Sequence, residues 1–263
     1  MLDVGAARLS HLRWQMALER FIRGSEVPDS LRGHDDCALG RWLAGEGLRL
    51  YGENQRIWVL KVAHKRFHRL ADQILGQGPS SGDQGAECLE KLRRVSRDIL
   101  FLLTSLELDA SGRGRESLRT RFLKWLRSRT RRSDARRPLS VTEARLAHLR
   151  WLGQLQDVLS GSGAAPERCS AASCPLGVWI DGVPNEIAAS NPDVVRALDD
   201  AHQRFHQAIE TTMTAQSAGD LHLADEAYGD ASDFSAEVVF HLTNLELAMA
   251  GSGELASEEA VEI

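Results

Sequence analysis

The residues best suited to chemistry are histidines and cysteines that the chain carries in two matching sets. Cys37 and Cys174 each open a Cys-x-Leu-Gly-x-Trp segment, and an identical His-Leu-Arg-Trp segment precedes each cysteine. A His-x-Arg-Phe-His segment follows each cysteine. The candidate metal ligands are His11, Cys37, His64 and His68 in the first half and His148, Cys174, His202 and His206 in the second. Imidazole nitrogens with one thiolate suit zinc, and they disfavour calcium, magnesium or manganese.

The two sets belong to a tandem duplication of one domain. A fourth pair of matching segments, at 103–108 and 242–247, closes the two halves, and all four pairs keep the same order with little drift in spacing. His64 and His68 stand four residues apart, so a helix presents both rings on one face. Chance alone produces such pairs on helices, but the copy at His202 and His206 argues against chance. For His11 taken alone, a buried histidine that is hydrogen-bonded to a backbone carbonyl is favoured over a metal ligand.

The elements that must position these residues are helices. Apolar residues recur at steps of three and four, while the strand-like alternation of Val and Ile is nearly absent. The long helices are predicted over 6–23, 57–75, 86–110, 141–159, 192–214 and 221–250. The fold class is therefore all-α, with two tandem four-helix-bundle-like domains.

Each cysteine is expected at the start of a short helix, where the positive end of the backbone dipole favours a thiolate. Pro175 suits the first turn of such a helix, since a missing amide proton costs nothing there. Gly40 predicts close approach of another helix, and Trp42 and Leu43 are expected in the core. Trp58 and Val62 are also expected to be buried, together with Leu60, Phe67, Leu70 and Ile74.

The domain boundaries follow from charge and composition. We expect bundles at 1–110 and 140–250, an Arg-rich linker at 111–139 that has helical spacing, and a disordered acidic tail at 251–263.

The linker and the second unit carry opposite charges. Between 111 and 137, ten arginines and Lys124 stand against Glu116 and Asp134, which gives a net charge of +9. Residues 138–263 hold five arginines against twenty acidic residues, which gives a net charge of −15. The linker is either a basic amphipathic helix for anionic lipid or nucleic acid, or a connector matched to the acidic second unit. We favour the connector, and expect neither nucleic acid nor a membrane as partner.

The absence of several sequence motifs excludes some classes of protein. The chain has no secretion signal and no long apolar run, so we expect a soluble, cytoplasmic protein. Inward carboxylates of a di-iron bundle and a haem-binding Cys-x-x-Cys-His motif are both missing from the sequence. Catalysis by Cys37 with His64 is conceivable, but four potential ligands leave no open position on a metal, and we therefore expect no enzyme activity.

Other histidines and cysteines lack counterparts in the other half, among them Cys88, Cys169, His222 and His241. We interpret Cys88 as a buried or half-buried thiol and the two histidines as structural. Cys169 is either idle or a spare thiol that attacks an oxidised Cys174.

The His-x-x-Trp, Cys-x-Leu-Gly-x-Trp and His-x-x-x-His motifs together resemble the chemoreceptor zinc-binding (CZB) domain of bacterial soluble chemoreceptors and zinc-regulated diguanylate cyclases. The resemblance covers roughly 1–110 and 140–250. It implies a helical bundle that binds one zinc through three histidines and one cysteine, hence two zinc ions per chain. It also implies a sensor that controls an output domain, often as a homodimer.

The chain departs from that family's architecture, because neither a methyl-accepting coiled coil nor a cyclase domain is recognisable in it. We therefore expect an internal pseudo-dimer or a homodimer that signals zinc level or thiol oxidation to a separate partner, such as a chemoreceptor or a cyclase. The alternatives are a structural adaptor whose zinc only stabilises the fold, and a surface binder that acts through the basic linker.

Overall fold

The computed structural model describes residues 4–25, 33–78, 82–112, 141–161, 170–183 and 185–259, and every regular element in these ranges is a helix. The predicted all-α class is thus confirmed. The first unit contains α1 (Val4–Ile22), α2 (Ala38–Ala44), α3 (Glu46–Tyr51), α4 (Gln55–Gln77) and α5 (Gly82–Gly112). The second contains α7 (Val141–Leu159), α8 (Pro175–Asp181), α9 (Asn185–Ser190), α10 (Pro192–Ala218) and α11 (Leu221–Glu259).

The first unit is a bundle in which α4 and α5 pack along each other and α1 lies on α5. Its core is formed by side chains from all five helices, among them the fully buried Leu18, Ile57, Phe67 and Leu103. Asn54 begins α4, because its side-chain oxygen accepts a hydrogen bond from the backbone N–H of Arg56 at 3.0 Å. The short α2 and α3 close one side of the bundle, where only the Cys37 segment had been predicted.

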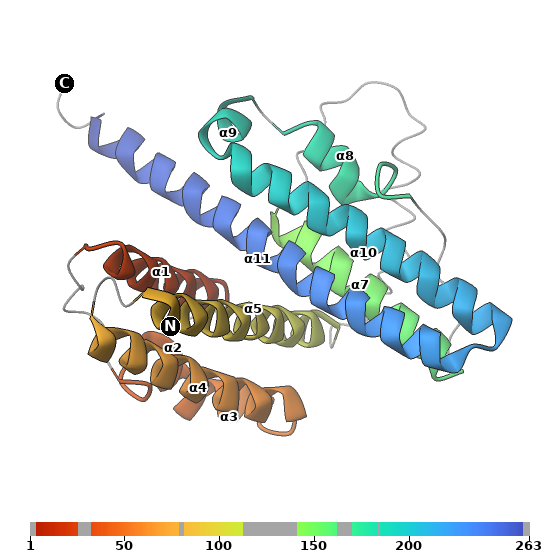
Figure 1. Cartoon of the computed structure of the whole chain (residues 1–263), viewed down its shortest axis with the longest axis horizontal. Coiled ribbons are helices and arrows are strands. Elements are labelled where there is room, and N and C mark those ends of the chain that lie inside the picture. Colours follow the sequence, from red (N-terminus) through yellow and green to blue (C-terminus); the bar gives the residue numbers. More distant parts are fainter. Residues whose placement is uncertain are drawn as a thin grey trace.

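The second unit repeats this arrangement with a long antiparallel pair, α10 and α11 (Figure 1). Gly219 ends α10 with a φ of 80°, a left-handed conformation that glycine adopts without steric cost. Asp220 then caps α11 by accepting from the backbone N–H of Leu223 at 3.1 Å. This tight turn holds the two helices side by side.

The two units pack against each other through α5 and α11, with α1 contacting α11 and α7 contacting α5 (Figure 1). Fully buried Leu12, Leu100 and Val239 form the apolar centre of this interface, with Phe101 and Phe240 packed beside them. Leu100 and Val239 stand at equivalent positions in the two repeats, as do Phe101 and Phe240. The interface therefore joins like surfaces, as an isologous dimer interface does.

Each unit also buries an arginine near this interface. Arg8 is 1% exposed and pairs with Glu107, and Arg145 is 0% exposed and pairs with Glu246 at 2.6 Å. Burial lowers the pKa of Arg145, and the charge of Arg8 lowers it further. The two ion pairs are therefore close enough to interact across the interface between the units.

The structure differs from the sequence predictions at several places. Trp58 and Val62 are 51% and 65% exposed, so their predicted burial is wrong. Helical periodicity marks them as one face of α4, but that face turns toward solvent and not toward α5. The last helix continues to Glu259, past its predicted end at Ala250 and into the tail 251–263 that was predicted to be disordered. Glu, Leu and Ala at 254–256 are strong helix formers, and they offset Gly251 and Gly253.

The linker 113–139 lies outside the described residues, as do 260–263, so its predicted role stays a prediction. Among the described helices, none combines the length and the apolar character that crossing a membrane requires.

Candidate metal centre

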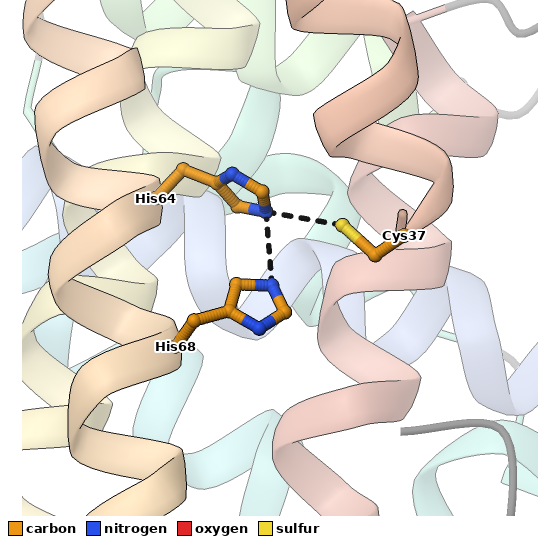
Figure 2. Close-up of side chains that lie close together, drawn as sticks. All are labelled: Cys37, His64 and His68. Carbon is orange, nitrogen blue, oxygen red and sulfur yellow. Dashed lines mark hydrogen bonds between the residues drawn. The ribbon is translucent and has the colours of Figure 1, made fainter. Parts of the chain in front are cut away.

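In the first unit, the candidate ligands come from three helices. His64 and His68 project from one face of α4 toward Cys37, which stands immediately before α2 (Figure 2). The sulfur of Cys37 lies 3.2 Å from Nε2 of His64, and the Nε2 atoms of the two histidines are 3.2 Å apart. These three side chains are buried, and their ligand atoms all lie within 4.8 Å of one another.

Cys37 is held by the backbone around it. Cys37 stands at the start of α2, as predicted, and its sulfur caps the helix by accepting a hydrogen bond from the backbone N–H of Gly40 at 3.2 Å. Its own N–H donates to the carbonyl of Gly33 at 3.1 Å. A β-carbon at Gly40 would lie 1.8 Å from the carbonyl oxygen of His34. Glycine is therefore needed because the preceding loop, and not another helix as predicted, approaches it.

His11 reaches the same place from α1. It is 4% exposed and lines a small cavity of about 10 Å³ together with Cys37, His64 and His68. Its Nε2 lies 3.1 Å from Oγ of Ser96 on α5. His11 is thus the fourth member of the set, although it is not part of the tight triad.

The second unit assembles the equivalent residues. The ligand atoms of His148, His202 and His206 lie within 4.8 Å of one another, and the sulfur of Cys174 lies 3.0 Å from Nε2 of His202. Cys174 caps α8 through the N–H of Gly177 at 3.3 Å, as Cys37 caps α2. All eight predicted ligand residues are therefore gathered into two clusters, one in each unit.

The known separations are compatible with ligands that share one cation. Zinc bonds of 2.0–2.3 Å at tetrahedral angles place neighbouring ligand atoms roughly 3.3–3.6 Å apart. The observed separations of 3.0–3.2 Å between sulfur and nitrogen or between two nitrogens are close to that spacing. In addition, both ring nitrogens of His148 are buried with no hydrogen-bond partner, although buried polar groups are rarely left so. A cation would supply a partner for one of these two nitrogens.

The histidines are held in the neutral form that binds metal. Burial is the main cause that lowers the pKa of His64 to about 3, and the neighbouring His68 and then His34 add to it. Burial likewise lowers the pKa of His202 to about 4 and those of His11 and His148 well below 6.5. Metal binding therefore needs no proton loss from these rings near neutral pH.

Burial and the helix start have opposite effects on the cysteines. Burial raises the pKa of Cys37 and of Cys174, and the backbone N–H groups of Gly40 and Gly177 offset this only in part. The helix start does favour the thiolate, since the N–H groups of Leu39 and Leu176 also lower the pKa of the sulfur that they face, but desolvation is the larger effect. A bound cation would favour the thiolate further.

Sequence reasoning missed Ser96 and His34 beside the first cluster, and also the buried Arg8 near the interface between the units. Ser96 and Arg8 have equivalents at Ser235 and Arg145, so a full comparison of the repeats would have found them. His34 has no such equivalent. Of the residues left as structural, Cys88 is buried as predicted, His222 is exposed and His241 is half-buried. Cys169 lies outside the described residues.

Two segments of the chain match one known family. Residues 11–75 and 148–213 each match the chemoreceptor zinc-binding domain, and each segment contains one complete set of candidate ligands. Neither the curated proteins nor the solved structures contain a match to the chain. The repeated motifs, the helical bundles and these two matches agree, and the chain belongs to the chemoreceptor zinc-binding domain family, with two copies in tandem.

Proposed function

We propose that the chain is a non-enzymatic tandem zinc sensor, in which each unit binds one zinc ion. The ligands are His11, Cys37, His64 and His68 in the first unit and His148, Cys174, His202 and His206 in the second. The observation that carries the proposal is the buried His148, whose ring nitrogens find no hydrogen-bond partner among the described residues. Its ligand atom lies within 4.8 Å of those of His202 and His206, and a shared cation would supply a partner for one of its two nitrogens.

The sensing mechanism follows from the helices that supply the ligands. His11 on α1, Cys37 before α2 and the histidines of α4 are tied together when they share one ion. α1 also contacts α11 of the other unit, so a shift of α1 reaches the interface between the units. Zinc supplies charge compensation for the thiolate and a tether between helices, and it takes part in no catalysis.

Two signals can release the tether. The first is a fall in the zinc level. The second is oxidation of Cys37 or Cys174 by a peroxide, which transfers one oxygen to the sulfur, yields sulfenic acid and leaves as water or an alcohol. Either change frees α2 or α8 from the histidines and is read by a separate output partner.

The metal content of the purified chain tests the assignment. We expect two zinc ions per chain in the wild-type protein and in Cys88→Ala, the matched control, since Cys88 is buried away from both clusters. Cys37→Ala and Cys174→Ala should each lower the zinc content or affinity. A Cys37→Ala/Cys174→Ala double variant that still retains two zinc ions with wild-type affinity contradicts the ligand assignment.

A chelator then distinguishes a sensor from a scaffold. Reversible zinc removal that leaves the helical content intact but changes partner binding or the solution mass supports the sensor. Gross loss of helix on zinc removal supports the structural adaptor.

A further inference from the structure

The two candidate centres differ by one histidine at the surface. His34 stands three residues before Cys37, where the second unit has Ala171 three residues before Cys174. The His34 side chain is 38% exposed, whereas the candidate ligands Cys37, His64 and His68 are each at most 8% exposed. His34 therefore lies between the first centre and solvent, and the second centre lacks this residue.

His34 is close enough to share a cation with the centre. Its ring centroid lies 6.3 Å from that of His68. The rings of His148 and His206, two candidate ligands of one centre, are 6.4 Å apart. A separation of this size is thus compatible with two imidazoles on one ion.

The loop presents His34 in a ready orientation. Nε2 of His34 lies 3.1 Å from a carboxylate oxygen of Asp35, and a carboxylate at this distance keeps the proton on Nε2 and leaves the lone pair on Nδ1. The backbone is fixed by the bonds from Asp36 and Cys37 to the carbonyl of Gly33, each 3.1 Å. The second unit has Ala172 in place of Asp35, so ligand and orienting carboxylate are both specific to the first unit.

We propose, on the basis of the proposed zinc function, that His34 is an exchange ligand, which binds zinc through Nδ1 while the ion enters or leaves the first centre. A closed four-coordinate site has no open position, and zinc can expand to five ligands. An extra imidazole at the surface lets the buried ligands attach or detach one at a time. The first centre therefore exchanges zinc faster than the second. One chain thus contains one site that releases zinc quickly and one that releases it slowly.

The experiment measures zinc release from the full-length chain into a chromogenic chelator by stopped flow. Single-centre variants, His202→Ala and His64→Ala, assign the kinetic phases to the first and second centre. We expect His34→Ala to slow release from the first centre about tenfold, which corresponds to about 1.4 kcal/mol in the activation barrier. The equilibrium zinc affinity should change much less, since an exchange ligand acts on uptake and release alike.

Two further variants sharpen the test. His34→Phe keeps a ring at the surface but offers no nitrogen, and it should be as slow as His34→Ala. Ala171→His/Ala172→Asp transplants the pair and should accelerate release from the second centre. A wild-type release rate in His34→Ala overturns the proposal, and so does a wild-type rate in His34→Phe, which would make His34 a steric cover. Failure of the zinc function itself is distinguished by a wild-type chain that binds no zinc at all.

Discussion

Substitution of Gly40 directly tests the structure of the loop before Cys37, residues 33–36, which we call the cysteine loop. A methyl group at Gly40 would lie 1.8 Å from the carbonyl oxygen of His34, whereas real β-carbons keep at least 3.0 Å from such atoms. The loop would have to retreat by about 1.2 Å, the difference between these distances. It is anchored through the bond from Cys37 to Gly33, so it cannot retreat without displacing the cysteine.

The expected cost of Gly40→Ala is that of an overpacked core site, about 1–3 kcal/mol of the free energy of unfolding. For a chain of this size, a loss of about 2 kcal/mol lowers Tm by roughly 4–8 °C. Because the sulfur of Cys37 moves with the loop, zinc affinity at the first centre should fall as well. Gly177→Ala should do the same in the second unit, since its methyl group would meet the carbonyl oxygen of Ala171 at the same 1.8 Å.

The matched controls are glycines with free space around them. Gly76 in α4 and Gly153 in α7 have no atom within 4 Å of an added β-carbon. Alanine there should stabilise the chain by roughly 0.5–1 kcal/mol, because it removes the conformational freedom of glycine in the unfolded state. Thermal unfolding followed by circular dichroism, with and without zinc, measures all four variants. If Gly40→Ala is as stable as Gly76→Ala and binds zinc like the wild type, the close approach of the loop is refuted.

Three further predictions concern other parts of the molecule. Arg145→Met should destabilise the chain by about 1–3 kcal/mol in chemical denaturation, because it leaves the carboxylate of Glu246, which is 28% exposed, without its buried partner. Arg145→Met/Glu246→Leu should recover most of that loss. Burial, aided by the charge of Arg97, lowers the pKa of His241 from 6.5 to about 4. Between about pH 6.5 and pH 4, His241 is therefore protonated in the unfolded chain but neutral in the folded chain. The free energy of unfolding falls as the pH drops through this range, by at most about 3 kcal/mol and by less with solvent screening. His241→Gln should remove this share of the pH dependence, and equal slopes in both proteins would contradict it. Ser96→Ala removes the partner of His11 and should weaken zinc binding at the first centre by about 10- to 100-fold in chelator competition, with the second centre unchanged.

Much of the candidate centre was predictable, because its information is local and is repeated. The spacing of His64 and His68 places both on one helix face in any helical fold, and the place of Cys37 before a short helix follows from the loop ahead of it. His148 and Cys174 repeat the same distances along the chain. The sequence alone is therefore enough to identify the candidate ligands, because the same metal-binding residue types occur twice at the same spacing.

The surroundings of the centre could be predicted only in part. Ser96 is marked in the sequence by its repeat at Ser235, but its role is visible only because α5 brings it beside His11. His34 has no such repeat, and it matters only because the loop before Cys37 brings it beside His68. Periodicity also failed for Trp58 and Val62, since it identifies an apolar face of α4 but not the surface that covers it.

The sequence by itself determined the duplication, the helical class and the eight residues that meet in two clusters, because residue type and helical spacing are properties of the chain over a few turns. Only the tertiary structure decided that the units join through Leu12, Leu100 and Val239, that burial raises the pKa of both cysteines, and that a carbonyl group occupies the space beside Gly40. Each of these depends on which atoms approach from distant parts of the chain and displace water there. That information lies in the packing of helices and not in the period of any one of them.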